Sequence, residues 1–413
     1  MEHFITEIKI DELRHLSNLV IPLDGENRQH LMITGKNGSG KTSLLEAMRK
    51  YLSAINDGKL NHINETYQRW LDIAEKKLKS ATTEGEKFQA EKNYQEKLSF
   101  IKKYKDGIDI RFNEYEDLEA LYKSGKFITA FFPADRKTEL LRGNGVEDVK
   151  LEESYAVTSE PGRLLLKYMV HLKTQQSYAR NEGDSETVAK IQKWFDRFEN
   201  ALKILLDDKS VTLEYNYKEY DFVIHEKGRK PFGLDEVSDG YSSVIYIVSN
   251  LMLRMDQNWL LKGNISEYNT EGIVLIDELE THLHIELQRK IMPFLVTFFP
   301  KLQFIVTTHS PYILNSISNA KAYDLESHTE IDNLSLYSAD GLAEGYFEAD
   351  EYSVDLRTKL ERYRILLNKT SPSKEERAER ARLRCELKNL SGELSPEAKV
   401  QFEEIEGNKH DPI

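Results

Sequence analysis

The N-terminal part of the chain alternates between short apolar runs and polar breaks. Residues 4–10 (FITEIKI) place apolar and polar side chains in alternation, as a strand with one exposed face does. Two further apolar runs follow at 18–23 and 30–35, and the second leads directly into a glycine-rich stretch. The sequence after that stretch, TSLLEAMRKYLSAI, has the spacing of an amphipathic helix. The pattern predicts three strands, a glycine-rich loop and a helix, in that order.

Residues 65–104 follow a different pattern, with many Glu, Lys and Gln residues and few apolar ones. The apolar positions, among them Trp70, Ile73, Phe88 and Leu98, fall on one face of a helix. The stretch ATTEGE between the two halves is typical of a turn, so a helical hairpin is predicted as an insertion. Its dense charge indicates a solvated surface more than a contact with nucleic acid.

The remaining pattern mixes strands and helices. Strands are predicted at 126–132, 273–278 and 304–310, a β-hairpin at 211–232, and helices within 162–206 and after residue 240. From about residue 351 the chain is again helical and strongly charged, with Ser-Pro breaks at 371 and 395. Strands and helices in this arrangement indicate an α/β fold.

Composition narrows the class of protein. The 413 residues are 39% hydrophobic, which is enough for a substantial core, and carry a formal net charge of −13. A chain this acidic is a poor candidate for a non-specific DNA coat. A single cysteine, Cys385, excludes an internal disulfide framework and a cysteine-based zinc cluster. The N-terminus does not resemble a signal peptide, and no apolar run is long enough to span a membrane. We expect a cytoplasmic protein with no membrane partner.

The glycine-rich stretch Gly35 to Thr42 (GKNGSGKT) matches the complete phosphate-loop pattern G-x-x-x-x-G-K-[ST]. Its glycines let backbone N–H groups turn toward phosphates, and the following helix directs its positive end at them. Lys41 is predicted to reach the terminal phosphates and Thr42 to ligate Mg²⁺. A plain glycine turn is the alternative, but the preceding strand and following helix favour nucleotide binding. The predicted nucleotide-binding residues are Gly35, Asn37, Gly38, Ser39, Gly40, Lys41, Thr42 and Ser43.

A phosphate loop requires an acidic partner, and the apolar run 273–276 ends in Asp277 and Glu278. A continuous apolar run is typical of a strand covered on both faces. Asp277 is predicted to hold Mg²⁺ with Thr42, and Glu278 to act as the general base toward water. The alternative is a core strand that ends by chance in two surface acids. The presence of the phosphate loop favours the magnesium site over this alternative.

His309 lies in the polar tail of the predicted strand at 304–310 and is predicted to contact the γ-phosphate or the attacking water. A second interpretation of the acidic segment stays open. Glu278, Glu280, His282 and His284 lie close together in sequence and form the ligand set of a hypothetical metal-dependent hydrolase.

These motifs together resemble the ATP-binding-cassette (ABC) ATPases, in particular the branch of RecF, SMC-like proteins and overcoming-lysogenization-defect (OLD) ATPases. The resemblance lies in the phosphate loop, in Glu280–His284 (ETHLH), in Thr308–Pro311 (THSP) and in Val237–Gly240 (VSDG). The last is similar to the signature of that superfamily, with valine in place of the usual leucine. The resemblance implies an α/β ABC-ATPase head, with a mixed-sheet core, an antiparallel β subdomain and a helical signature lobe.

The resemblance also implies how the chain works. The expected cofactors are ATP and Mg²⁺, and Ser238 and Gly240 are expected to contact the γ-phosphate bound by a second copy, paired head to tail. Arg136 is a candidate for the loop that lies between phosphate loop and signature in this superfamily. His282 and His284 fall in its dimer-contacting loop. The implied division is an N-terminal ATPase lobe (1–64), a hairpin insertion (65–104), the remaining head (105–350) and a charged helical extension (351–413).

The chain resembles stand-alone ATPases of antiphage defence, such as the ATPase subunits of Septu- or PARIS-like systems. These imply a homo-oligomer that controls a separately encoded effector, which is expected to be a nuclease. The extension has no pattern of a Toprim nuclease domain, so this chain is not expected to be a nuclease itself. A RecF-like protein that binds DNA when ATP dimerises it is the alternative, so nucleic acid is left open as a partner. Catalysis is assigned to Lys41, Glu278 and His309 in both cases.

Overall fold

A computed structural model describes residues 2–137, 139–262, 269–331, 354–369 and 371–390 of the chain. The chain divides into two compact units, Met1–Tyr337 and Ser338–Ile413. Among the described residues, no helix is both long and apolar enough to cross a membrane.

The first unit is built on a six-stranded sheet with the strand order β12-β11-β3-β10-β9-β5. All neighbours run parallel except β12, which is antiparallel to β11. The strands are β3 (His30–Thr34), β5 (Phe127–Phe132), β9 (Glu271–Ile276), β10 (Leu302–Thr307), β11 (Ala320–Asp324) and β12 (Thr329–Ile331). Every residue of β3 and β10 is buried, as expected for central strands covered on both faces. The carboxyl ends of β3, β10 and β9 therefore meet at one edge.

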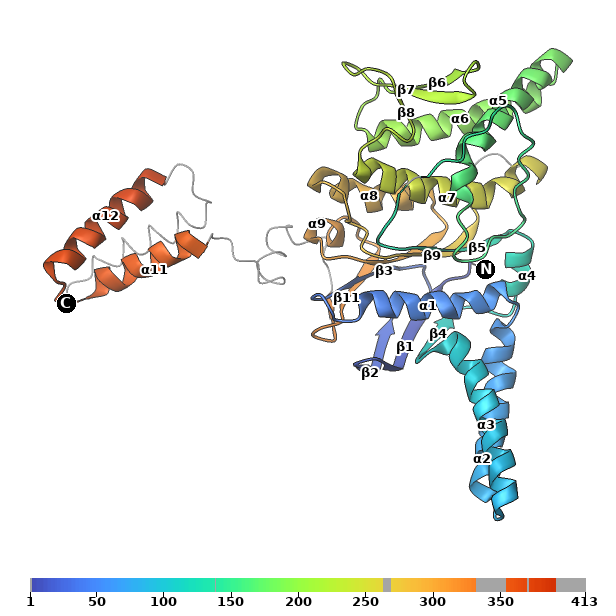
Figure 1. Cartoon of the computed structure of the whole chain (residues 1–413), viewed down its shortest axis with the longest axis horizontal. Helices are drawn as coiled ribbons and strands as arrows, with labels where there is room; N and C mark the ends of the chain where they lie inside the picture. Colours follow the sequence, from blue (N-terminus) through green and yellow to red (C-terminus); the bar gives the residue numbers. More distant parts are fainter. Residues whose placement is uncertain (1, 138, 263–268, 332–353, 370, 391–413) are drawn as a thin grey trace. The chain divides into compact units, whose positions relative to one another are not determined.

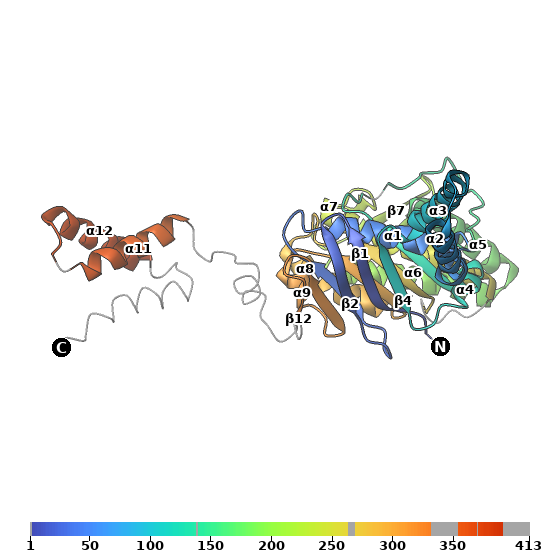
Figure 2. The same cartoon turned by 90° about the horizontal axis from the view of Figure 1, so that it is seen from below.

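A three-stranded antiparallel sheet lies on the other side of helix α1 (Lys41–Asn56). Its strands are β1 (Ile5–Leu13), β2 (Leu16–Pro22) and β4 (Ile108–Phe112). Figure 1 shows α1 between the two sheets, and Figure 2 shows β2, β1 and β4 side by side from below. One hydrophobic core contains α1 residues together with side chains of both sheets, for example Leu44, Ile8 and Ile305. Helix α4 (Leu118–Lys123) packs against the same core.

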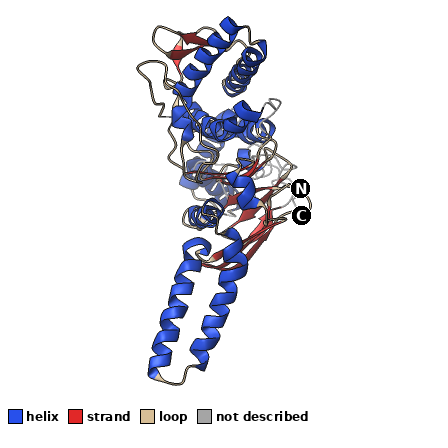
Figure 3. Ribbon diagram, turned by 90° about the vertical axis from the view of Figure 1, so that its right-hand side faces the viewer, coloured by secondary structure: helices blue, strands red, loops and turns tan. Residues whose placement is uncertain are grey.

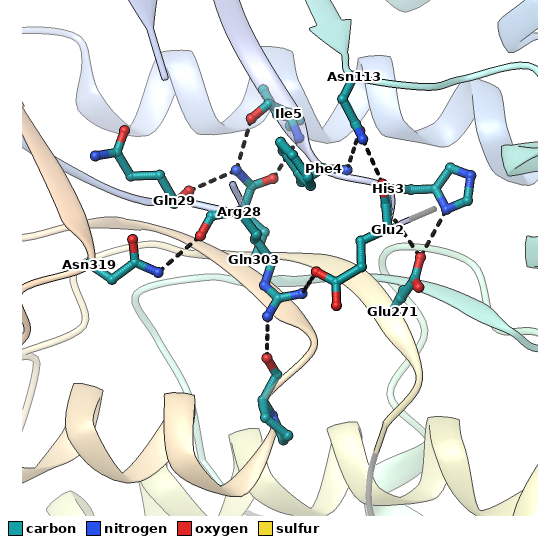
Figure 4. Close-up of polar contacts among 11 residues, drawn as sticks. Glu2, His3, Phe4, Ile5, Arg28, Gln29, Asn113, Glu271, Gln303 and Asn319 are labelled. Carbon is teal, nitrogen blue, oxygen red and sulfur yellow. Dashed lines mark hydrogen bonds and ion pairs between the residues drawn. The ribbon is translucent and has the colours of Figure 1, made fainter. Parts of the chain in front are cut away.

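Gln303 of β10 fastens the antiparallel sheet to the central one. Its amide accepts a hydrogen bond from the Ile5 backbone N–H at 2.7 Å and donates to the carbonyls of Ile5 and Gln29. Close by, the His3 ring contacts the Glu271 carboxylate at 2.8 Å (Figure 4). The N-terminal strand is thus held to the sheet that carries the acidic segment.

A helical lobe covers the opposite face of the central sheet (Figure 1). Its elements are η2 (Pro161–Leu164), α5 (Leu165–Glu182), α6 (Ser185–Leu205), α7 (Asp239–Lys262), α8 (Ile285–Phe298), α9 (Pro311–Leu314) and the small sheet β6 (Thr212–Asn216), β7 (Asp221–His225) and β8 (Phe232–Gly233). Trp194 is buried there, and its indole N–H donates to the Asp256 carboxylate of α7 at 2.6 Å. The predicted α/β class, with a mixed sheet, an antiparallel sheet and a helical lobe, is confirmed.

Residues 62–105 form η1 (His62–Thr66) and two long helices, α2 (Tyr67–Ser80) and α3 (Glu84–Lys105). Figure 3 shows α2 and α3 side by side, as a hairpin. Thr83 and Glu86 form a capping box at the start of α3, which satisfies backbone N–H groups that a helix leaves open. Tyr67 and Phe100 stack with their ring centroids 3.8 Å apart and join the two helices near the base.

The second unit contains α11 (Val354–Asn368) and α12 (Lys374–Leu390). Leu360, Tyr363 and Leu387 form its small core, and Arg362 makes an ion pair with Glu379 across the two helices. The rest of the predicted extension, residues 351–353, 370 and 391–413, lies outside the described residues.

Candidate functional site

The phosphate loop connects β3 to α1 and depends on glycine at three positions. Gly35, Gly38 and Gly40 have φ angles of 130°, 87° and 102°, a backbone region that residues other than glycine rarely adopt. A Cβ on Gly35 would lie 2.7 Å from the Ser39 hydroxyl oxygen, so there is no room for a side chain. The glycines of the motif therefore allow the backbone turn that a phosphate loop requires.

Lys41, the first residue of α1, lies over its own loop. Its ammonium donates to the carbonyls of Gly35 at 2.6 Å and Lys36 at 3.2 Å. Burial lowers the pKa of Lys41, while the carboxylates of Glu278, Glu280 and nearby acids act in the opposite direction. A partly dehydrated ammonium gains more from an anion than a solvated one does.

The acidic segment follows β9 at the same edge. Asp277 is buried, and its carboxylate accepts a hydrogen bond from the Thr307 hydroxyl at 2.6 Å. The same hydroxyl accepts a hydrogen bond from the Glu278 backbone N–H at 2.7 Å. Glu278 has a φ of 43°, in the left-handed region. Thr307 at the end of β10 thus holds both acids in place, a role that no sequence motif indicates.

His309 lies between the phosphate loop and the acids because β10 lies between β3 and β9. Its backbone N–H donates to the Glu280 carboxylate at 2.5 Å. Burial is the main cause that lowers the pKa of His309, and the positive charge of Lys41 adds to it. The imidazole is therefore neutral at pH 7. In the ATPase interpretation Glu280 therefore holds the backbone of His309, a role that sequence reasoning missed.

The loop, Lys41 and Glu278 surround a cavity of about 210 Å³. Its lining residues are Arg14, His15, Asn37, Gly38, Gly40, Lys41, Thr42, Ser43 and Glu278. Arg14 and His15 come from the β1–β2 turn, and the His15 ring contacts the Ser39 carbonyl at 3.1 Å. Sequence reasoning missed both, since their approach to the loop depends on how the antiparallel sheet packs.

Among the described residues, three buried polar atoms in the phosphate loop or close to Lys41 lack a hydrogen-bond partner: the Ser39 hydroxyl, one Glu280 carboxylate oxygen and Nε2 of His309. Buried polar atoms are normally paired, so unpaired ones at one location indicate a site for a polar ligand. Hydroxyl, carboxylate and ammonium groups here fit a magnesium–nucleotide complex, because Mg²⁺ prefers oxygen ligands and phosphates need donors.

The predicted signature lies elsewhere in the chain. Ser238 is exposed just before α7, and Gly240 is buried in its first turn. Ser238 lines a second cavity of about 310 Å³, together with Arg229, Lys230, Tyr241 and other residues. None of the described residues lining this cavity lines the phosphate-loop cavity. The phosphate loop and the predicted signature, the two half-sites that the resemblance implies, therefore line separate cavities.

The alternative metal centre is not assembled. Among the described residues, no group of three or more His, Cys, Asp or Glu side chains is placed to hold a metal ion. Glu280 bonds the backbone of His309, and the exposed His284 ring lies edge-on to Tyr241. His282 is exposed, with a φ of 65°. This arrangement gives no support to the metal-dependent hydrolase.

Comparison with known proteins identifies relatives of this chain. The chain is 25% identical over 418 aligned positions to the Septu protein PtuA of Bacillus mycoides (strain KBAB4), an alignment that covers 97% of this chain and 51% of that protein. It is 23% identical to the Retron Vc95 probable ATPase of Vibrio cholerae serotype O1 biovar El Tor, over 70% of this chain and 67% of the relative. The chain thus spans about half the length of the first relative.

Among solved structures, the chain is similar to an SMC head bound to the C-winged helix domain of ScpA, with a TM-score of 0.37 and 12% identity over 78% of this chain and 94% of that one. A protein-family model described as "AAA domain, putative AbiEii toxin, Type IV TA system" matches residues 31–315. That range includes the phosphate loop, the signature, the acidic segment and His309. The chain belongs to this AAA-domain family.

Proposed function

We propose that this chain binds and hydrolyses ATP with Mg²⁺, pairs head to tail with a second copy, and controls a separately encoded effector in bacterial antiphage defence. Family membership and the arrangement of Lys41, Glu278 and His309 at one sheet edge support the ATPase activity. The names of the relatives, a Septu protein and a retron probable ATPase, support the role in defence.

The residues of the phosphate loop are assigned to the phosphates of ATP. The backbone N–H of Ser39 donates to the Lys36 carbonyl at 3.1 Å, so we assign the N–H groups of Asn37, Gly38 and Gly40 to the phosphates. Lys41 exchanges its contact with the Gly35 carbonyl for the terminal phosphates. Thr42 and Asp277 are the residues that would hold Mg²⁺, with Ser43 beside them. When bound, the metal supplies positive charge to the phosphate oxygens.

Hydrolysis requires a water oxygen to bond the γ-phosphorus while the bond from that phosphorus to the β,γ-bridging oxygen breaks. Glu278 is placed to take the proton that the water loses, and ADP leaves with the bridging oxygen. Neutral His309 can donate one hydrogen bond to the γ-phosphate. Glu280 holds the backbone of His309 at this position.

Head-to-tail pairing rests on one observation: the signature and the phosphate loop line separate cavities in the same chain. The cavity at Ser238 is lined by the cations Arg229 and Lys230, by the start of α7 and by one acid, Glu236. Lys230 and the N-terminal end of α7 favour an anion there, whereas Arg229 already pairs with Glu226. If both half-sites act on one nucleotide, they must come from two chains. The hairpin 65–104 and the extension 351–413 are proposed as the docking surfaces for the effector, and 1–64 with 105–350 as the ATPase head.

A mixing experiment tests the pairing. Lys41→Ala disables the phosphate loop, and Ser238→Arg blocks the signature with a long charged side chain, so each variant alone should lack ATPase activity. Mixed in equal amounts, about half of random pairs combine both variants and contain one intact site, so about a quarter of the wild-type rate per chain should return.

Ser99→Arg adds the same side chain at an exposed position of α3 and should leave the rate unchanged. Full activity of Ser238→Arg alone, or no recovery on mixing, would contradict the composite site. Failure of the wild type to hydrolyse ATP would contradict the proposed activity itself.

A further inference from the structure

Arg136 is a buried cation close to the acidic segment. It follows β5, is 1% exposed, and its guanidinium donates five hydrogen bonds inside the first unit. Burial lowers the pKa of Arg136 to about 10, against the raising effect of Asp277, Glu280 and Glu278, so it stays charged at pH 7. A buried charge is costly unless its contacts are specific, which makes this position informative.

Four of its hydrogen bonds go to backbone carbonyls. Nη1 donates to Asp277 at 2.5 Å and to Pro133 at 2.7 Å, and Nη2 donates to Glu278 at 3.0 Å and to Leu279 at 3.4 Å. Three consecutive carbonyls of the acidic segment therefore converge on one guanidinium. The planar fork of arginine supplies several donors in fixed directions, which the single ammonium of lysine cannot do.

This contact holds an unusual backbone conformation. Glu278 has a φ of 43°, which is strained for a residue with a side chain and persists only where its surroundings enforce it. Thr307 holds the Glu278 N–H, and Arg136 holds the carbonyl of the same residue. The backbone between these two contacts determines the direction in which the Glu278 side chain leaves it.

The fifth hydrogen bond leads to the signature helix. Nε of Arg136 donates to the Ser243 hydroxyl at 3.0 Å, and buried Ser243 belongs to α7, five residues after Ser238. A Cβ on Gly240 would lie 2.6 Å from the His282 carbonyl oxygen, so the same helix also packs closely on the segment after the acids. The start of α7 and the turn at Glu278 are therefore joined through Arg136.

We propose that Arg136 is a positioning residue, which orients Glu278 for catalysis and ties that orientation to the placement of α7. The proposal rests on the proposed ATPase function. When α7 docks on a nucleotide in the partner chain, a shift of Ser243 moves Arg136 and with it the carbonyls of the acidic segment. Each active site then responds to whether its own chain has engaged the neighbouring nucleotide.

Arg254 provides a matched control. It is 2% exposed and also lies in α7, but its guanidinium donates to the carbonyls of Thr129, Tyr155, Ala156 and Ser159, away from the acidic segment. Arg136→Met should lower kcat about 100-fold with KM changed less than about 2-fold, because misplacing the base affects the chemical step and not ATP binding. Arg136→Lys should recover part of kcat.

Arg254→Met should lower thermal stability as much as Arg136→Met does. Its kcat should nevertheless stay within about 3-fold of wild type at a temperature where the Arg136→Met and Arg254→Met variants are both folded. Equal kcat losses in the Arg136 and Arg254 variants would overturn the proposal while leaving the ATPase function intact. If Arg136→Met does not fold, the kcat losses of Arg136→Lys and Arg254→Lys are compared in the same way.

A double variant tests whether Arg136 acts through Glu278. In single-turnover measurements, the hydrolysis rate of the double variant Arg136→Met, Glu278→Gln should be within about 3-fold of the rate of Glu278→Gln alone. The effects of two substitutions are not additive when the two residues act as a unit. A further loss equal to that of Arg136→Met by itself would mean general damage and overturn the proposal.

Ser243→Ala removes only the contact to α7 and should lower kcat about 5-fold at unchanged KM. A wild-type kcat in that variant would overturn the link to the signature helix. Wild-type protein without ATP turnover would instead refute the proposed function.

Discussion

Gly240 lies where the start of α7 meets the segment after the acids, and it has no space for a side chain. In the superfamily resemblance this glycine is expected to contact a nucleotide in the partner chain. Its surroundings give it an additional task within its own chain, since a Cβ would lie 2.6 Å from the backbone oxygen of His282. A contact with backbone is not easily relieved by a rotamer change.

We expect Gly240→Ala to lower the free energy of unfolding by about 1–3 kcal/mol, because α7 and the His282 segment must separate. Gly85→Ala in α3 is the control: a Cβ there meets nothing within 4 Å, so stability should not fall. Urea unfolding of both variants measures the difference. Equal stability of the two would contradict close packing at Gly240.

A second prediction concerns the pH dependence at His309. The pKa of its imidazole is lowered from 6.5, first by burial and then by Lys41, so the neutral form persists below pH 6.5. Activity that depends on neutral His309 should therefore decline only as the pH falls below 6.5. The measurement is kcat/KM across the acidic range for wild type and for His309→Gln, which cannot take up a proton. The variant should be about 10- to 100-fold slower and lack this acidic limb. A limb above pH 6.5 would contradict the prediction.

At the level of elements, the strand order β3-β10-β9 brings the phosphate loop, the segment of His309 and the acidic segment to the same edge of the central sheet. Thr307 is the last residue of β10, and its hydroxyl joins Asp277 to the Glu278 backbone. Because β10 is parallel to both neighbours, the end of this strand reaches the acids and the phosphate loop at once. β10, which lies between the strands that carry the phosphate loop and the acidic segment, therefore contributes to the position of both motifs.

Thr307→Val keeps the shape of the side chain but removes its hydroxyl. Asp277 loses a donor and the Glu278 N–H loses its acceptor, which should cost about 1–3 kcal/mol of stability. Turnover should fall about 10- to 100-fold, as is typical when a residue that orients a ligand is removed. Thr307→Ser, which retains the hydroxyl, should stay close to wild type in steady-state ATPase assays. Similar rates for the valine and serine variants would rule out this role.

Much of this arrangement could be predicted from sequence because its signals are local. Continuous apolar runs mark β3, β9 and β10, and the glycines and Lys41 follow directly after one of them. The strands β4, β11 and β12 were not predicted, since they are short and partly polar, and they become strands through pairing with distant residues. β11 (AKAYD), for example, pairs with β3, which is nearly three hundred residues earlier.

The contacts that hold the site were harder to predict. Arg136 precedes its carbonyl partners in the acidic segment by 141 to 143 residues, and an arginine in a polar stretch gives no sign that it is buried. Arg14 and His15 reach the phosphate loop only because the antiparallel sheet packs over α1. Motifs show which residues carry the chemistry, whereas the residues that orient them depend on the tertiary fold.

At the level of the whole molecule, the proposed division of the active site between two chains would make association a condition for catalysis. ATP that is not hydrolysed should keep two chains together, because its triphosphate is held by the phosphate loop of one and the signature of the other. This applies to the head, Met1–Tyr337, which contains both half-sites.

We therefore expect Glu278→Gln to lower turnover by about 100-fold or more and to accumulate the ATP-bound assembly. Mass measurement by light scattering, with and without Mg²⁺ and ATP, detects it. Glu286→Gln, at an exposed position in the first turn of α8, should behave as wild type. A Glu278→Gln protein whose mass is unaffected by ATP would contradict the association.

A site divided between two chains also makes the amount of protein part of its control. If the proposed pairing holds, most chains at low copy number remain single and hold ATP without cleaving it, and catalytic capacity rises more steeply than expression does. Supplying a cell with the Lys41→Ala chain would then draw intact chains into defective pairs. The separate cavities at Ser238 and Lys41 thus predict a genetic property, interference by a disabled copy, from the geometry of one chain.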